Sequence, residues 1–172
     1  TRLVHMLRAL ADTSLCRIVM IHHPPTHVGL NRRRHLHDAN ALQKVLTTGG
    51  VNLVLHGHTH ATMLSHIHPS GHSGHSGHSE LGIAIPVVGV RSASAFNDNP
   101  KRMAQYHLYQ IEPVPCPGHT TRFRINLLVR GYDTDSGGFQ SVGRYTLSPR
   151  NAPRYDLDDL DDLDDLDDLD DL

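Results

Sequence analysis

Residues 18–25 read Ile-Val-Met-Ile-His-His-Pro-Pro, and residues 53–60 read Leu-Val-Leu-His-Gly-His-Thr-His. Each stretch begins with a run that is apolar at successive positions, which is typical of a parallel strand buried on both faces. Each run stops at histidines, and the two prolines of the first cannot continue a ladder because they lack an N–H. The sequence therefore predicts two buried parallel strands with histidines at their ends.

A helix is predicted between these strands. Asp38 stands at a capping position, apolar residues recur at 39, 42, 45 and 46, and Gly49 follows as a stop signal. A strand, a helix and a strand over this distance predict a right-handed βαβ crossover. Both histidine loops then leave the same, carboxyl-terminal edge of one sheet.

The remaining segments indicate an α/β fold. Apolar residues at helical spacing from Leu3 to Leu15 predict a first helix. Strand-like runs at 83–90, 106–111 and 123–129 are joined by Gly, Pro, Ser and Asn, as in an antiparallel meander.

The formal net charge of −2 conceals two parts of opposite sign. Residues 1–155 carry +9, whereas residues 156–172 hold eleven of the 18 acidic groups. The Leu-Asp-Asp repeat of the tail at 151–172 has period three, which builds no continuous apolar face on a helix or a strand. Because its carboxylates repel one another, we expect this tail to be disordered.

Composition excludes several classes of protein. No apolar stretch approaches the roughly 20 residues of a membrane span, and no secretory signal begins the chain. Two cysteines are too few for a disulfide framework, so we expect a soluble, cytoplasmic protein. The basic body suits an anionic partner, although the lack of an aromatic platform beside its basic groups argues against nucleic acid. Nothing in the sequence sets the oligomeric state.

Eight of the sixteen histidines fall between His56 and His78. We expect His66, His68 and the three histidines of the Gly-His-Ser repeat, within a segment at 70–80, to be solvated loop residues. Loose metal binding by this His-rich tract is the alternative.

His22, His58 and His60 differ because each stands at a strand end. In an extended segment residues 58 and 60 point to the same side, with Thr59 turned away. His22 ends a neighbouring strand, and adjacent strands lie about 4.8 Å apart. Three neutral imidazoles at one sheet edge predict a metal site, while a His-x-His pair without metal remains the alternative.

The two opening stretches resemble the C-terminal half of calcineurin-like metallophosphoesterases. Among these, the bacterial enzymes that resemble cyclic-AMP phosphodiesterases are the most similar group. The likeness runs from about residue 1 to about residue 145 and includes residues 32–34, 38–42, 85–90, 92–95 and 106–111.

The resemblance implies an α/β fold that is the C-terminal half of a two-sheet β-sandwich flanked by helices. Residues 1–150 are then a partial phosphoesterase domain, with 70–80 as an insertion. The family hydrolyses phosphodiesters or phosphomonoesters with a metal-bound hydroxide at a binuclear centre of Mn, Fe or Zn. A small-molecule phosphate ester is the implied substrate.

Residue by residue, the resemblance assigns His22 as a metal ligand and divides His58 and His60 between two ions. His23 is left as a neighbour near the substrate, and His56 has no assigned role beyond a strand-end hydrogen bond. Three arginines follow His22 and are placed to attract a phosphate, with a solvated basic loop as the alternative. They are Arg32, Arg33 and Arg34.

The family's upstream motifs, Asp-x-His, Gly-Asp and Gly-Asn-His-Asp/Glu, have no counterpart in this sequence. The chain, which begins at Thr1, is therefore expected to lack the N-terminal half, and no catalytic residue is assigned. Two dications repel unless an anion lies between them, and three neutral imidazoles supply none. We expect at most one weakly bound ion and little turnover.

Two alternatives remain open. One is a degenerate module that binds metal or a partner without catalysis. The other, an amidohydrolase-like barrel, also uses His-x-His after a strand, but there the motif belongs to the first strand.

Overall fold

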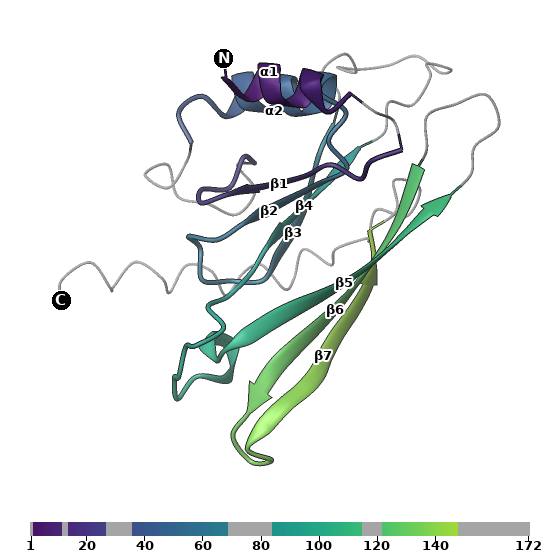
Figure 1. Ribbon diagram of the computed structural model, residues 1–172. Coiled ribbons are helices and arrows are strands. Elements are labelled where there is room, and N and C mark those ends of the chain that lie inside the picture. The colour runs from purple at the N-terminus through teal and green to yellow at the C-terminus, as the bar shows by residue number, and fades with distance from the viewer. Residues whose placement is uncertain (1, 12–13, 27–35, 69–83, 115–121, 148–172) are drawn as a thin grey trace, which may run out of the picture.

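The computed structural model describes residues 2–11, 14–26, 36–68, 84–114 and 122–147. Within them the chain forms two sheets that face each other, with two helices on one side (Figure 1). The predicted α/β fold with two sheets flanked by helices is confirmed. The expectations for Arg32, Arg33 and Arg34, for the insertion at 70–80 and for the tail at 151–172 concern residues outside the described ranges.

The larger sheet has the strand order β1-β2-β4-β3. Strands β1 (Ile18–Ile21) and β2 (Leu53–His56) run parallel, and α2 (Ala39–Thr48) separates them along the chain. Ile21 pairs with His56, so the residues that follow both strands meet at one edge. The predicted strand-helix-strand unit is confirmed, although the Asp38 side chain makes no capping hydrogen bond.

Strand β4 (Ile85–Gly89) corrects the expected meander. It pairs in parallel with β2 and antiparallel with β3 (Met63–Ile67), a strand that the sequence did not predict. All five residues of β4 are buried, as a central strand requires. Pro86 fits there because the pairing with β2 begins one residue later, at Val87, so no ladder bond to β2 needs its missing N–H.

The smaller sheet is an antiparallel meander in the order β5-β6-β7. It consists of β5 (Gln105–Val114), β6 (Arg122–Asp133) and β7 (Gly138–Thr146). A 3-10 helix, η2 (Pro100–Arg102), precedes β5. The runs at 106–111 and 123–129 lie inside two of these strands, whereas β7 was not predicted because its residues alternate weakly in polarity.

Two apolar cores hold the layers together. On one side of the larger sheet, Val54 and Val87 pack with Leu46 of α2 and Leu7 of α1 (Arg2–Ala9). On the other side, Leu53 and Val88 pack with the smaller sheet, mainly against Ile125, Leu127 and Val129 of β6. The molecule therefore has a helical layer, a mixed sheet and an antiparallel sheet in succession (Figure 1).

Helix α1 is shorter than predicted. It ends at Ala9, and Leu10 and Leu15 are exposed, so the helical spacing of the leucines does not mark one continuous buried face. In the described part of the chain, no helix is both long and apolar enough to cross a membrane.

Candidate metal centre

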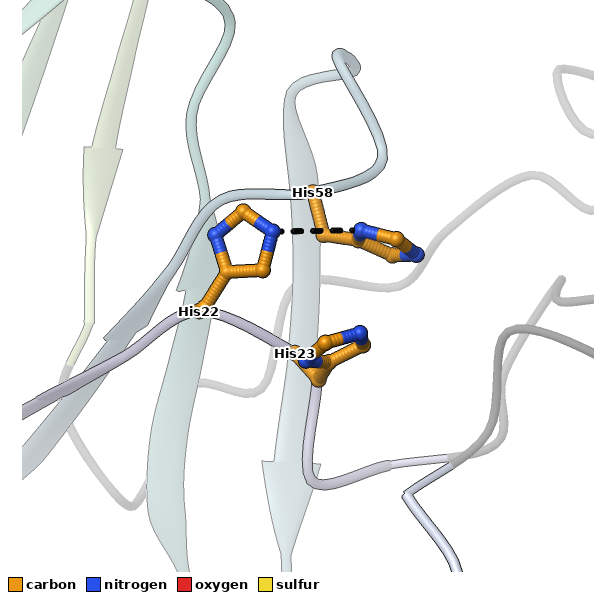
Figure 2. Close-up of side chains that lie close together, drawn as sticks. All are labelled: His22, His23 and His58. Carbon is orange, nitrogen blue, oxygen red and sulfur yellow. Dashed lines mark hydrogen bonds between the residues drawn. The ribbon is translucent and has the colours of Figure 1, made fainter.

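Three histidines meet at the carboxyl-terminal edge of the parallel strands. His22 and His23 follow β1 directly, and His58 lies two residues beyond β2. One ligand nitrogen of each ring lies within 4.8 Å of the others (Figure 2). The ring centroids of His23 and His58 are 4.2 Å apart, and those of His22 and His58 are 5.1 Å apart. The structure thus brings together two of the three predicted ligands and adds His23.

The closest approach in this group has the spacing of two ligands of one ion. Nδ1 of His58 lies 3.3 Å from Nε2 of His22, and one of the two nitrogens donates to the other. In a tetrahedral zinc site two nitrogen ligands stand roughly 3.4 Å apart, because each Zn–N bond is about 2.1 Å long. The spacing of these two nitrogens therefore matches that of two ligands of a single nitrogen-preferring ion.

Hydrogen bonds hold the backbone of the loop that carries His22 and His23. The Gly57 N–H donates to the carbonyl of His22 at 3.2 Å, which ties the two loops together. Pro25 is buried, and its carbonyl accepts from the Gln43 side chain of α2 at 2.6 Å. The Thr26 and Ser65 hydroxyls share a buried hydrogen bond of 2.9 Å. The histidine rings thus project from a backbone that is held in place.

The predicted extended conformation of the segment after β2 is wrong. His58 and His60 have positive φ angles of 67° and 52°, and the Thr59 N–H donates back to the Gly57 carbonyl. The chain turns here because it must leave the line of β2 and reach β3 on the far side of β4. His60 is exposed and is not one of the three grouped histidines, so its role as a ligand stays a prediction.

His56 is the strand-end histidine that the sequence led us to expect. Its ring is buried, with 3% exposed, and Nδ1 lies 3.0 Å from the Gly57 carbonyl. Burial lowers the pKa of His56 below its usual value, so a neutral imidazole donates from Nδ1. The ring lies against Gly89, where an added Cβ would stand 2.7 Å from Cε1.

We expect Gly89→Ala to lower the free energy of unfolding by about 1–3 kcal/mol, because the new methyl group overlaps the buried His56 ring. Chemical denaturation monitored by circular dichroism measures the loss. Gly138→Ala is the control, since nothing lies within 4 Å of a Cβ at that position. Equal free energies of unfolding for the Gly89→Ala and Gly138→Ala variants would show that Gly89 and the His56 ring are not in close contact.

A groove of about 310 Å³ opens between the two sheets beside the histidine loop. Met20, Leu55 and Tyr109 give it apolar walls, and Gly57 links it to the histidine group. Arg91 and His107 also line it, and Nε of the arginine and Nε2 of the histidine are buried without a hydrogen-bond partner within the described residues. The groove therefore combines apolar walls with two polar residues that each keep one buried nitrogen without a hydrogen bond within the described residues.

Sequence reasoning gave His107 no role, although its alternation with Tyr109 in a strand places both side chains on one face. Nδ1 of His107 lies 3.1 Å from the Tyr109 hydroxyl. Burial lowers the pKa of His107 to about 4 and raises that of Tyr109. At neutral pH both groups are uncharged, and the tyrosine hydroxyl is placed to donate to the imidazole.

Acid is expected to destabilise the chain through His107. Its pKa is about 4 in the folded chain, against about 6.5 for a histidine in an unfolded chain, so the unfolded chain binds more protons in this window. The free energy of unfolding then falls as the pH drops from about 6.5 to about 4, by at most about 2 kcal/mol after allowance for partial solvation. Urea unfolding at about pH 7 and about pH 4.5 measures the slope.

His107→Gln should reduce this slope, because glutamine keeps a hydrogen-bonding group and does not titrate in this range. His5→Gln, an exposed position on α1, is the control and should leave the slope unchanged. If the free energy of unfolding changes equally with pH in the natural chain and in both variants, the acid sensitivity arises from other groups. His56 and His66, whose pKa values burial also lowers, would then be the first to test.

His66 is a correction to the expected loop assignment. It lies in β3 opposite Pro86, is half-buried, and has its pKa lowered first by burial and second by the charge of His68. Because β3 was not predicted, its histidine was assigned to a loop.

Comparison with known proteins supports the resemblance over part of the chain. Residues 4–62 match the family model described as calcineurin-like phosphoesterase. This third of the chain contains most of α1, the whole β1-α2-β2 unit and all three histidines of the group. A search among curated proteins gave no match. The narrower likeness to enzymes that resemble cyclic-AMP phosphodiesterases stays a prediction.

Proposed function

We propose that this chain is a metal-dependent phosphoester-hydrolase module that holds one divalent ion at the edge of β1 and β2. The observation that carries the proposal is the 3.3 Å separation between ring nitrogens of His22 and His58 at the ends of parallel strands. The match of residues 4–62 to the calcineurin-like phosphoesterase family supports phosphate esters as the substrate class. We propose further that the substrate is a small molecule and that the protein is cytoplasmic.

His22 and His58 are the proposed ligands, and the ring of His23 stands close enough to serve as a third ligand or to contact substrate. The resemblance assigns His60 to the second ion of an intact binuclear centre. A divalent ion, when bound, supplies Lewis acidity toward a phosphate oxygen. Arg32, Arg33 and Arg34, on the sequence between β1 and α2, are proposed to attract the phosphate by charge.

One ion, weakly held, is the proposed occupancy. The grouped side chains are three imidazoles, and neutral imidazoles cannot offset the repulsion of two dications about 4 Å apart. The proposed turnover of phosphodiesters by this chain alone is therefore low or absent. The genomic DNA immediately upstream distinguishes this hydrolase module from a degenerate module, because an in-frame Asp-x-His and Gly-Asn-His-Asp would supply the missing carboxylates and favour the hydrolase.

Phosphate binding tests the function without requiring turnover. With zinc added, the chain should bind inorganic phosphate in a calorimetric titration, and His58→Ala should abolish the binding. His68→Ala, which changes a histidine outside the group, is the control. Phosphate binding that does not depend on zinc, or that survives His58→Ala, would contradict the proposal.

A degenerate, non-catalytic metal-binding module is the second candidate. It is favoured by the absence of any carboxylate from the histidine group in the part of the chain that the structure describes. A chain that binds zinc but has no affinity for phosphate would support this non-catalytic module.

A further inference from the structure

The side of the smaller sheet turned away from the larger one carries a cluster of arginines. Ile125, Leu127 and Val129 of β6 face the core, so the alternate residues of this strand face outward. These outward positions and their neighbour on β7 form what we call the arginine face. Its arginines are Arg122, Arg124, Arg130 and Arg144.

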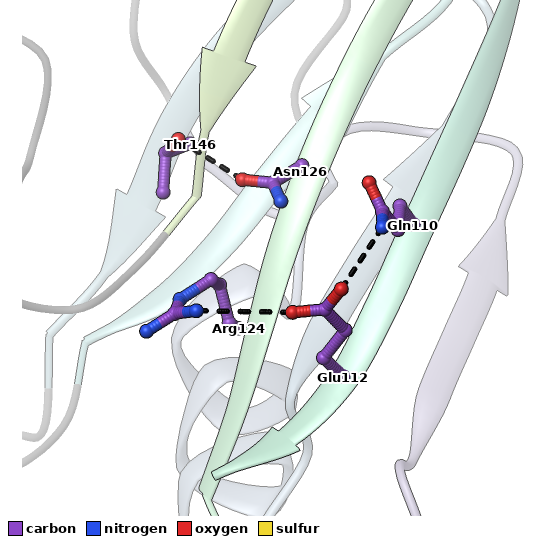
Figure 3. Close-up of polar contacts among 5 residues, drawn as sticks. All are labelled: Gln110, Glu112, Arg124, Asn126 and Thr146. Atoms are coloured by element: carbon purple, nitrogen blue, oxygen red, sulfur yellow. Dashed lines mark hydrogen bonds and ion pairs between the residues drawn. The ribbon is translucent and has the colours of Figure 1, made fainter.

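Negative charge on this face is sparse. Glu112 of β5 lies 3.7 Å from Arg124 and also accepts from Gln110 at 2.9 Å (Figure 3). Arg130 is held by hydrogen bonds to Ser141 and to the Phe139 carbonyl. Within the described residues, Arg122 and Arg144 have no carboxylate partner. The face thus carries four positive groups against one carboxylate.

Apolar side chains lie among these charges. Leu108 of β5 is 51% exposed, and Leu128, opposite it on β6, is half-buried. At the far end of the face, the Phe139 ring packs against the Tyr106 ring, with centroids 4.8 Å apart. Rings that pack edge to face against each other offer little free surface on which bases could stack. The face therefore suits an acidic segment with apolar residues better than a nucleic acid.

We propose that the arginine face binds the acidic Leu-Asp-Asp segment of this same chain, residues 156–172. The segment carries eleven aspartates and six leucines, which complement the arginines and the exposed apolar side chains respectively. Single exposed ion pairs contribute little, so binding depends on several pairs formed together and weakens with salt.

The connection is long enough for this contact. Nine residues separate Thr146, the last residue of β7, from Asp156, so these two residues can stand roughly 33 Å apart when the connection is extended. The twelve residues of β6 extend over about 40 Å. The segment can therefore fold back along the sheet from which the chain leaves.

The test uses the full chain with all eleven aspartates of 156–172 changed to asparagine, which frees the face. A fluorescein-labelled peptide of residues 156–172 is titrated with this protein at low salt, and its anisotropy is measured. We expect binding about tenfold tighter than to the natural chain, whose own tail competes at high effective concentration. Salt at about 0.5 M should abolish it.

Arg122→Gln with Arg144→Gln, introduced into the asparagine-tailed chain, should weaken peptide binding about fivefold. Arg2→Gln with Arg8→Gln on α1 removes the same charge elsewhere and should leave binding unchanged. Circular dichroism checks the fold, and Arg144→Gln alone, at an exposed position of an edge strand, replaces the pair if the double variant does not fold.

Three results would overturn the proposal: no peptide binding, equal weakening by both arginine pairs, or tighter binding of a single-stranded oligonucleotide of equal charge to the same face. The last result would assign the face to nucleic acid.

Discussion

Replacing His22 by alanine is expected to weaken zinc binding by about 100-fold. Loss of an outer-sphere partner already costs 10–100-fold in metal affinity, and a direct ligand should cost at least as much. His22 is exposed, so the change should leave the fold intact. Competition with a chromophoric chelator measures the affinity.

The many other histidines require a clean background for this measurement. We would therefore first change His72, His75 and His78 of the Gly-His-Ser repeat to glutamine, since a His-rich tract can bind metal loosely. In that background His58→Ala should weaken zinc binding as much as His22→Ala does, and His5→Ala, at an exposed position, should leave the zinc affinity unchanged. Equal affinities of the His5 and His22 variants would place the metal elsewhere.

The second large effect is expected at β1, an edge strand of the larger sheet within the described residues. Met20 of β1 is 79% exposed, and Ile18 on the same face is 41% exposed, although their neighbours Leu55 and Leu53 pack toward the smaller sheet. An apolar edge strand without a charge or proline is a template for pairing with another chain. We expect the chain to associate, and Met20→Lys to weaken association by tenfold or more.

Sedimentation over a range of concentrations measures this effect. Phe96→Lys is the matched control, because Phe96 is 77% exposed but lies outside any strand. If Phe96→Lys dissociates the chain as well as Met20→Lys does, general hydrophobic contact and not the β1 edge drives association. A monodisperse natural chain would contradict the prediction altogether.

The part of the fold near the histidines could be predicted from the sequence because its signals are local. The apolar runs that end at His22 and His56, with an amphipathic helix between them, define the parallel unit without reference to other segments. Strands β3 and β7 could not be predicted in this way. Their residues alternate weakly in polarity, and they become strands through pairing with β4 and β6.

In the candidate site too, local signals predict one part and the pairing of distant segments determines the other. Ile21 pairs with His56, the last residue of the parallel neighbour, and this register brings His22 beside the loop of His58. The turn after Gly57 depends on where β3 lies in the sheet, which no local pattern reveals. For this reason the sequence placed His60 beside His58, whereas the structure places His23 there.

Metal content and hydrolysis, measured together on one preparation, test whether the chain holds a single ion and lacks turnover. After zinc or manganese loading and gel filtration, elemental analysis of the chain with the Gly-His-Ser histidines replaced should give at most one ion per chain. The same sample should hydrolyse bis(p-nitrophenyl) phosphate no faster than a His22→Ala/His58→Ala variant. Two ions per chain, together with turnover at about 1 s⁻¹ or faster, would contradict the proposed single-ion site.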